Sequence, residues 1–501
     1  MRKLLVGLVA VAAVAGFTTS AKAAVITVDT ATDNYGFGAP GCSLRNAVSS
    51  ADEDSPGFGT CPEGSGDDTI KVPGGVYELS LIGPGFGNAT GDLGISHPEA
   101  VTIEPAAATQ RVTIDGLYAD RILTRTGTGT TTLRNMSLVK GQTPLAAGPM
   151  SYGSEGGAIR NRGTLNLEGV LISDSRSGMI GGAIHNGGTG VLNVTNSTLS
   201  GNKASFSGGG IVNEDDGLVS VRSSTITLNE ADSDGNGTGA AGGIVQDSSG
   251  TFSMYNTILA GNIDASAPSL PDCRTAPNFF PRYVISTQTL GAGECLVGFN
   301  PPTNQSPVNP RLQPLADNTG PTFTHAIPGT SPAVDAGADG SVTLDACPAT
   351  DARGVTRPAG QCDIGAYEFV DTTPPPPEPL PGRRTPTGSI ATFDGEVLYI
   401  RLKCPARFKP KCRSTAVPMT RKRNGRAMAR KALVITRSNR YKLVSFVIRP
   451  AFRARVEAMT FVDRKRLVVR QKIRSKRVHT RKAGRPATVF HTYKVRVRSS
   501  S

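Results

Sequence analysis

An internal repeat between residues 130 and 262 constrains the fold of this 501-residue chain more than any other feature. The segment LNLEGVLISDS is followed by LNVTNSTLSGN, VSVRSSTITLN and FSMYNTILAGN, at residues 165–175, 192–202, 219–229 and 252–262. Residues 131–141 fit this template more loosely, so successive copies begin 34, 27, 27 and 33 residues apart. Apolar residues at positions 1, 3 and 8, with polar residues between them, predict two short strands per copy.

A second motif recurs between these copies and predicts how they stack. It reads GGAIRN, GGAIHN, GGGIVN and AGGIVQ, at residues 156–161, 181–186, 208–213 and 241–246. Repeats of this length are typical of a solenoid, in which each coil buries its apolar face against its neighbours. In stacked parallel strands, equivalent residues lie about 4.8 Å apart. We therefore expect buried amides to hydrogen-bond from coil to coil in one ladder, formed by Asn161, Asn186, Asn213 and Gln246, and in a shorter one, formed by Asn202, Asn229 and Asn262.

These patterns predict an all-β fold built on a right-handed parallel β-helix. The composition agrees, because 59 Gly, 35 Pro, 5% aromatic residues and no Trp favour a turn-rich β architecture over a helical bundle. A leucine-rich repeat would need leucines at fixed places, and they are absent. The open alternative is a β-sandwich with glycine-rich turns.

The charge distribution divides the chain into two parts. Residues 383–501 contain 34 Lys and Arg against 4 Asp and Glu, a net charge of +30, whereas residues 1–382 carry −16. The run PPPPEPLP at 374–381 directly precedes this reversal and favours a semi-rigid polyproline spacer. Strand-like apolar segments then predict a small basic β-domain, with disorder as the alternative; they occupy residues 397–402, 442–449 and 489–498.

The first 23 residues predict export. Arg2 and Lys3 precede an apolar run at 4–17, which is followed by AKA at 21–23. This order is typical of a secretory signal peptide, and the run is too short for a stable membrane-spanning helix. An uncleaved anchor is the alternative. We expect the mature chain to be extracellular or on the cell surface, with no membrane span.

Export makes the cysteines candidates for disulfides, because their number is even and the compartment is oxidising. The eight are Cys42, Cys61, Cys273, Cys295, Cys347, Cys362, Cys404 and Cys412. Pairing of sequence neighbours is the simplest connectivity. Zinc is the rival interpretation, but no CxxC and no nearby histidine supports it.

Two end motifs resemble those of a known family. The segment GCSLRNAV at 41–48, followed by DDTI, resembles the CSLREA segment of secreted bacterial β-helix proteins, with Asn46 where that motif has Glu. Four motifs, GPTFTHA, SPAVDAG, DARG and CDIGAYE, resemble the closing segment of choice-of-anchor Q proteins, at residues 320–326, 331–337, 351–354 and 362–368. The GGAI-x-N copies resemble repeats of polymorphic outer-membrane proteins. This resemblance covers about residues 24–370 and implies a secreted or surface, pectate-lyase-like solenoid, mostly without an assigned activity.

The sequence thus predicts six segments. They are a signal peptide at 1–23, an N-terminal cap at 24–100, β-helix repeats at 101–319, a C-terminal cap at 320–370, a Pro-rich linker at 371–382 and a basic β-domain at 383–501.

Catalytic chemistry has weak candidates only. Glycoside hydrolysis needs two carboxylates across the bond, and the adjacent Asp215 and Asp216 are the only such pair that stands out. They are interpreted as a polar turn that ends in Asp-Gly. Arg160 and Arg162 flank a ladder position and are expected to be solvated, and His185 to be an exposed side chain rather than a base.

No cofactor or metal site is predicted. The five histidines are scattered along the chain, and Asp335, Asp339, Asp345, Asp351 and Asp363 lack the spacing of an EF-hand.

Two functions stay open at this point. The first is a non-catalytic surface or matrix protein that uses a β-helix face for adhesion or binding. The alternative is a polysaccharide-active enzyme, a lyase or a glycoside hydrolase, with an atypical site. For residues 383–501 we expect retention on acidic cell-envelope polymers or surface glycans, because a net +30 attracts polyanions. Nucleic acid is a secondary candidate partner.

Overall fold

The structure is a computed structural model of the whole chain. In the N-terminal part it describes residues 23–371, apart from 56, 84–86, 145–152, 248, 267–270, 276–277, 289–302, 339–345, 359 and 361. In the C-terminal part it describes 390–393, 397–403, 411–419, 427, 429, 432–437, 441–449, 452–453, 456, 467–475 and 487–499. The predicted signal peptide up to residue 22, the linker from 372 to 382, Cys295 and Cys404 lie outside these ranges.

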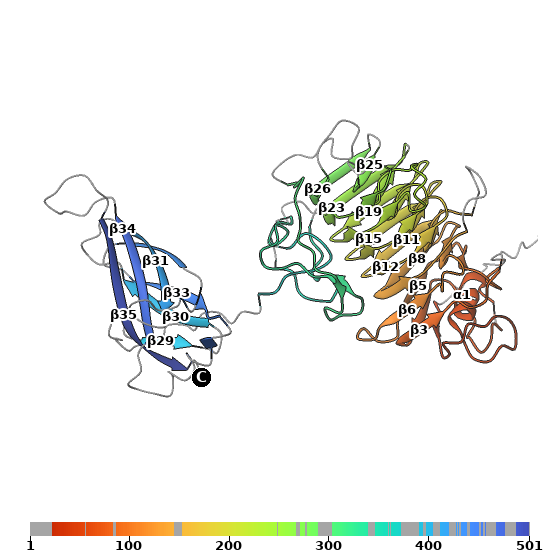
Figure 1. Cartoon of the computed structure of the whole chain (residues 1–501). Helices are drawn as coiled ribbons and strands as arrows, with labels where there is room; N and C mark the ends of the chain where they lie inside the picture. Colours follow the sequence, from red (N-terminus) through yellow and green to blue (C-terminus); the bar gives the residue numbers. More distant parts are fainter. Residues whose placement is uncertain are drawn as a thin grey trace, which may run out of the picture. The chain divides into compact units, whose positions relative to one another are not determined.

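The chain forms two compact units, Met1–Val370 and Asp371–Ser501. The first is a parallel β-solenoid of about seven turns, which confirms the predicted fold class (Figure 1). Each full coil contributes strands to three walls, and every pair of neighbouring strands in these walls is parallel.

The first wall contains one strand from each coil, from β1 at its N-terminal end to β26 at the other. Its strands are β1 (Val25–Thr27), β2 (Asp68–Val72), β5 (Val101–Pro105), β8 (Thr130–Arg134), β11 (Thr164–Glu168), β15 (Val191–Thr195), β19 (Leu218–Arg222), β23 (Thr251–Leu259) and β26 (Phe279–Ser286).

The second wall is continuous with the first, because β23 pairs with β19 through its first half and with β20 through its end. Its other strands are β3 (Gly75–Glu78), β6 (Val112–Asp115), β9 (Met136–Val139), β12 (Leu171–Ser173), β16 (Thr198–Ser200) and β20 (Thr225–Thr227).

The third wall is a separate sheet of three-residue strands. They are β4 (Leu93–Ile95), β7 (Leu123–Arg125), β10 (Ile159–Asn161), β14 (Ile184–Asn186), β18 (Ile211–Asn213), β22 (Ile244–Gln246) and β25 (Cys273–Thr275). Two-residue strands form a small fourth sheet, β13 (Arg176–Ser177), β17 (Lys203–Ala204), β21 (Glu230–Ala231) and β24 (Ile263–Asp264).

The core consists of apolar side chains that stack at equivalent positions. In the first wall, Leu133 pairs in register with Leu167, Leu167 with Val194, and Val194 with Val221. All four are at most 2% exposed. Positions 1 and 3 of the sequence template therefore point inward, and the polar position between them points outward.

The N-terminal end carries a cap that includes one helix, α1 (Leu44–Glu53), which the sequence analysis did not predict. The Ser43 side chain caps it by accepting the amide of Asn46 at 3.1 Å. The guanidinium of Arg45 is fully buried and binds both carboxylate oxygens of Asp33, at 2.7 and 3.0 Å. A Cys42–Cys61 disulfide closes the loop beside it.

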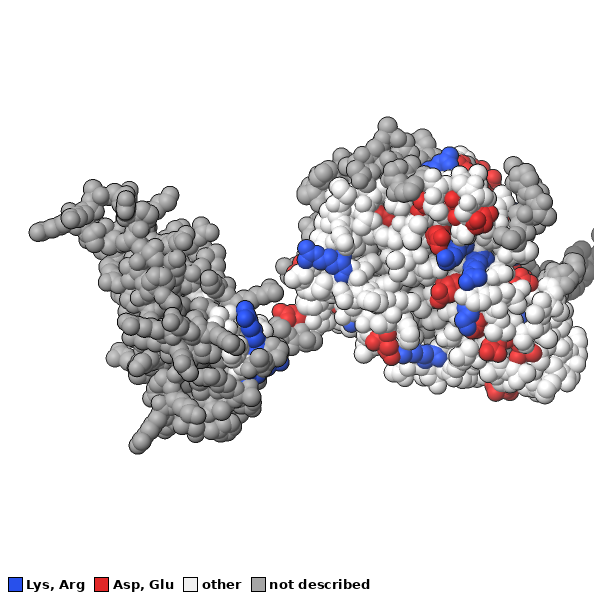
Figure 2. Space-filling view, viewed as in Figure 1, with Lys and Arg blue, Asp and Glu red and all other residues white. Residues whose placement is uncertain are grey.

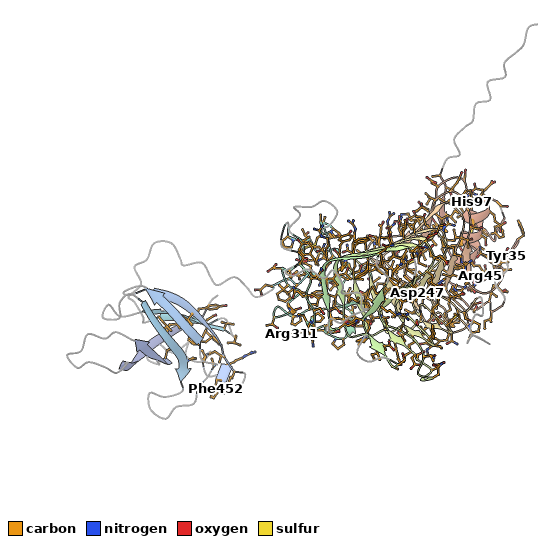
Figure 3. The ribbon with its side chains drawn as sticks, turned by 90° about the horizontal axis from the view of Figure 1, so that it is seen from above. Tyr35, Arg45, His97, Asp247, Arg311 and Phe452 are labelled. Carbon is orange, nitrogen blue, oxygen red and sulfur yellow. A yellow bond between two sulfur atoms is a disulfide. The ribbon has the colours of Figure 1, made fainter. Side chains whose placement is uncertain are left out.

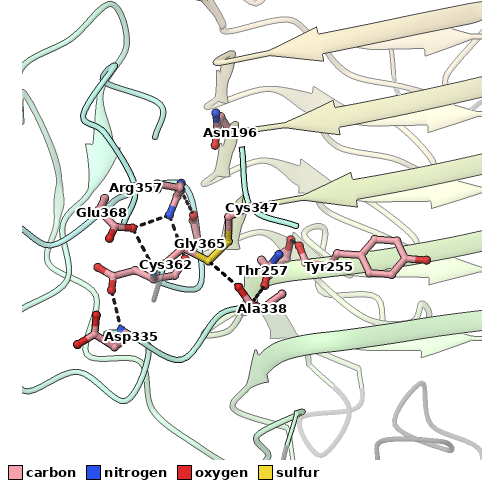
Figure 4. The surroundings of a disulfide bond; sticks show 12 residues. Asn196, Tyr255, Thr257, Asp335, Ala338, Cys347, Arg357, Cys362, Gly365 and Glu368 are labelled. Carbon is pink, nitrogen blue, oxygen red and sulfur yellow. Dashed lines mark hydrogen bonds and ion pairs between the residues drawn. A yellow bond between two sulfur atoms is a disulfide. The ribbon is translucent and has the colours of Figure 1, made fainter. Parts of the chain in front are cut away.

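The segment expected as a C-terminal cap at 320–370 contacts several coils and not the last one alone. The described residues of 303–371, which we call the flank segment, run back along the outer face of the second wall (Figures 1 and 4). Backbone groups near its end bind Thr225 and Asn256, and the carbonyl of Gly320 accepts Arg111 Nε at 3.0 Å. The outer faces of β12, β16 and β20 are buried, because this segment covers them.

The flank segment has its own supports. A Cys347–Cys362 disulfide closes one loop, and β27 (Leu315–Ala316) pairs with β28 (Thr324–His325). Arg357 is 5% exposed and donates to Glu368 Oε2 at 2.8 Å (Figure 4). Burial raises the pKa of Glu368 and of Asp363 and lowers that of Arg357.

The second unit is a seven-stranded sheet around its own apolar core, as predicted for a basic β-domain. In sheet order its strands are β32 (Ala432–Arg437), β31 (Lys411–Met419), β34 (Leu467–Ser475), β35 (Ala487–Ser499), β29 (Ile390–Phe393), β30 (Val397–Lys403) and β33 (Tyr441–Val447). The β29–β35 pair is parallel, and the other pairs are antiparallel.

Candidate functional site

The structure places the four amides of the longer ladder in one buried stack at the corner after the third wall. Asn161 Nδ2 donates to Asn186 Oδ1 at 2.6 Å, and Asn186 Nδ2 to Asn213 Oδ1 at 2.7 Å. Asn213 Nδ2 donates to Gln246 Oε1 at 2.6 Å. Each amide group also donates to a backbone carbonyl of its own turn. These residues hold the corners of the coils and are not a ligand site.

The shorter ladder lies at a second corner. Asn202 Nδ2 donates to Asn229 Oδ1 at 2.9 Å, and Asn229 Nδ2 donates to Asn262 Oδ1 at 3.0 Å. Asp272 accepts from Asn262 Nδ2 at 3.0 Å and so ends the stack.

Asp215 and Asp216 lie in the exposed turn between β18 and β19, and each binds a different neighbouring coil. Asp215 Oδ2 accepts the amide of Gly188 at 2.9 Å, and Asp216 Oδ1 accepts the hydroxyl of Ser249 at 2.6 Å. The two carboxylates thus tie turns together rather than facing each other across a cleft, which is consistent with their interpretation as a turn.

The expectation for His185 was wrong. The residue is 2% exposed, and its Nε2 lies 2.9 Å from Glu214 Oε2. It was misjudged because outward positions of the third wall are covered by loops from other coils, as they are at Val212, which packs against Ile180 and Ala241. The next residue in the column, Arg160, is also largely buried and pairs with Glu155 at 3.7 Å, whereas Arg162 is exposed as expected.

A polar network adjoins this column. Arg121 is 8% exposed and donates to Asp92 Oδ2 at 3.2 Å and to the carbonyls of Gly153 and Glu155 at 2.8 and 3.0 Å. Burial opposes ionisation of Glu155, yet the Gly153 amide and the nearby Arg160 and His185 hold its pKa below the usual value. Arg121 thus joins Asp92 to the backbone of Gly153 and Glu155, and so holds residues 153–155 against the third wall.

An open groove lies between the first wall and the flank segment. Its volume is about 520 Å³, within the usual range for ligand sites. The solenoid side contributes Arg134, Asn135, Glu168, Gly169, Thr195 and Asn196, and the flank segment contributes residues that include Pro321, Pro348, Thr350 and Arg353.

Three side chains give this groove its chemistry. Arg134 Nε binds Glu168 Oε2 at 2.7 Å, and 40% and 46% of these two side chains are exposed. Asn196 Nδ2 donates to the carbonyl of Thr350 at 2.8 Å, while its Oδ1 is buried and accepts no hydrogen bond. The groove therefore presents a cation and a carboxylate that are paired with each other, whereas the amide oxygen of Asn196 is buried behind its wall.

A cluster of three side chains in the N-terminal cap could hold a metal ion, and it was not predicted from the sequence. Ligand atoms of Asp54, His97 and Glu99 lie within 4.8 Å of one another in the N-terminal cap. The scattered histidines gave no sign of it, because Asp54 is remote in sequence from the other two. The only indication in the sequence was that His97 and Glu99 lie two residues apart.

The fold defines the class of protein: a parallel β-solenoid with a flank segment, followed by a basic β-domain. No family model, curated protein or solved structure matches the chain. Within the part of the chain that the structure describes, no helix is long and apolar enough to cross a membrane.

Proposed function

We propose that the solenoid unit is a non-catalytic binding scaffold of the cell surface or extracellular matrix. Its ligand is a neutral, hydroxyl-rich polymer such as a polysaccharide, held in the groove beside the first wall. The observation that carries this proposal is the groove itself, where the exposed side chains of Arg134 and Glu168 offer donors and acceptors together.

The outer face of the first wall extends this surface along the solenoid axis. One outward column consists of small polar residues in register: Thr132, Asn166, Asn193, Ser220 and Ser253. The amide of Asn193 donates to Asn166 Oδ1 at 2.9 Å, so these groups are held in a row. Such a row favours an elongated ligand with regularly spaced hydroxyl groups.

The adjacent column favours a neutral ligand over a charged one. Glu104 lies between Lys71 and Arg134, at 2.5 and 3.5 Å, and Arg134 in turn binds Glu168. The hydrogen bond from Lys71, and then the one from Arg134, hold the pKa of Glu104 below its ordinary value. Cations and carboxylates alternate and neutralise each other, and Figure 2 shows basic and acidic side chains interspersed on the face it draws.

The basic unit supplies retention in this proposal. Its net charge of +30 lies on a folded β-domain, so a summed field would hold the chain on acidic envelope polymers. The acidic solenoid unit would remain available for its own ligand. The CSLREA and choice-of-anchor Q resemblance supports a surface location.

The test is binding of the full chain to a panel of neutral and acidic polysaccharides, measured by calorimetry. Binding is to be compared with that of the double variant R134Q/E168Q, which removes both charges of the pair and so leaves neither group unpaired. We expect neutral polymers to bind and the double variant to weaken binding at least tenfold, or about 1.4 kcal/mol. R162A is the matched control, because this exposed arginine lies at the third wall, away from the groove.

The same mixtures are to be assayed for new reducing ends and unsaturated sugars. Product release by the purified chain, abolished in D215N/D216N, would replace this proposal by the enzymatic alternative. Equal binding by R134Q/E168Q and the wild type would exclude the groove as the ligand site.

A further inference from the structure

We propose that the N-terminal cap binds one divalent transition-metal ion, with Zn²⁺ as the best fit, through Asp54, His97 and Glu99. Asp54 follows the last residue of α1 and adopts a left-handed conformation, with φ of 44°. His97 and Glu99 belong to the connection between β4 and β5. His97, labelled in Figure 3, has its Nε2 3.7 Å from Asp54 Oδ2, too far for a good hydrogen bond. The ligand atoms of all three residues lie within 4.8 Å of one another.

Each of the two half-buried carboxylates of this cluster has one oxygen atom that lacks a hydrogen-bond partner. Asp54 Oδ1 and Glu99 Oε2 are both buried, and neither accepts a hydrogen bond. A desolvated carboxylate oxygen without a donor is costly, and the cost rises when two such groups lie close together. A cation held by the two carboxylate groups would compensate their charge and supply a partner that the protein does not.

The surrounding backbone holds the histidine loop in place. Asp52 Oδ1 accepts the amide of His97 at 2.7 Å, and Asp67 Oδ1 accepts the amide of Ala100 at 2.9 Å. Arg125 is fully buried and donates to the carbonyl of His97 at 3.4 Å. These contacts fix the backbone on both sides of the histidine without using the side chains of the three candidate ligands.

The imidazole can present Nε2 to a metal at little cost. The amide of Glu99 donates to His97 Nδ1 at 3.3 Å, which is long for a hydrogen bond. Metal binding at Nε2 requires the ring proton on Nδ1 and so gives up only this weak contact.

The donor set selects the class of cation. One imidazole nitrogen and two carboxylates suit Zn²⁺ or Mn²⁺, whereas Ca²⁺ and Mg²⁺ prefer oxygen ligands alone. The ion would join the end of α1 to the start of the coil that contains β5. It would therefore stabilise the cap against the solenoid.

The test is metal uptake by the full chain after chelation, dialysis and titration with Zn²⁺, followed by mass spectrometry and calorimetry. We expect one Zn²⁺ per chain, at least tenfold weaker binding in H97Q and in E99Q, and a lower melting temperature in chelator. E63Q is the matched control, because Glu63 is an exposed carboxylate of the same cap.

X-ray absorption of the zinc-loaded wild type gives a second readout that needs no variant. An oxygen and nitrogen shell with a single imidazole supports the site, and sulfur ligands or several imidazoles overturn it. Uptake that is absent from the wild type, or unchanged in both H97Q and E99Q, overturns it as well.

Discussion

At the scale of residues, the amide ladders show what a repeat can predict. Asn161, Asn186 and Asn213 occupy one place in successive motifs, and in a parallel coil one sequence place becomes one spatial stack. Their positions could therefore be inferred without any tertiary information. His185 shares the same strands but points outward, and its surroundings depend on loops that the repeat does not specify.

Replacing a ladder amide should be costly. Asn186→Ala removes the hydrogen bonds to Gly190 O and Asn213 Oδ1 and the one accepted from Asn161. Since an unsatisfied buried polar group costs about 1–3 kcal/mol, we expect the free energy of unfolding to fall by about 2–4 kcal/mol. Chemical denaturation measures this loss. Asn193→Ala, at an outward position of the first wall, is the control and should cost under about 1 kcal/mol; equal losses in the two variants would contradict the structural role of the ladder.

At the scale of elements, the strands of the repeats were predictable and helix α1 was within reach. Leu44, Ala47, Val48 and Ala51 are spaced as one buried helical face, and Ser43 is a good N-cap. The same residues resemble the CSLREA motif, and they were interpreted only as that motif, so the helical spacing of their apolar residues was not used. The course of the flank segment had no comparable signal, because its partners are short strands whose outward Thr and Ser residues resemble solvent-facing ones.

The docking of the flank segment should depend on pH through His325. Its Nε2 lies 2.9 Å from Ser200 Oγ, and its Nδ1 lies 2.7 Å from the carbonyl of Gln313. Burial lowers the pKa of His325 below the ordinary 6.5. The unfolded or undocked chain therefore takes up a proton that the docked state does not, and stability falls as the pH drops below 6.5.

Hydrogen exchange of the flank segment at pH 7.5 and pH 5.5 measures this effect. His325→Asn removes the titrating group and should flatten the difference between the two pH values. A difference that persists unchanged in this variant would assign the pH dependence to the carboxylates instead.

At the scale of the whole molecule, the boundary between the compact units at residue 371 and the reversal of charge at residue 383 lie on either side of the Pro-rich run. Composition is averaged over many residues, so it marks a unit boundary more reliably than it marks a site. The metal-capable cluster and the groove escaped prediction for the opposite reason. Each depends on a few side chains that the tertiary fold brings together.

Retention on the cell envelope should require the basic unit. We expect cells that express the full chain to keep it in the envelope fraction, and cells that express residues 1–382 to release that product into the medium. Salt at 1 M should release the full chain, because exposed charges are screened over about 3 Å at that strength, against about 8 Å at physiological strength. A truncated chain that stays on the envelope, or a full chain that molar salt does not release, would refute electrostatic retention.

The flank segment also limits how such a molecule can change in length. A bare solenoid can gain or lose coils by duplication or deletion, since each coil contacts only its neighbours. Here the segment is fastened near Arg111 in the coil of β6 and near Asn256 in the coil of β23. Those fastenings are five coil steps apart, about 24 Å at the usual strand spacing. An inserted coil would separate the two attachment points by one more step, so part of the flank segment would lose its contacts with the second wall. The length of the flank segment therefore limits the number of coils between its two attachment points, whereas the corner loops can vary in size.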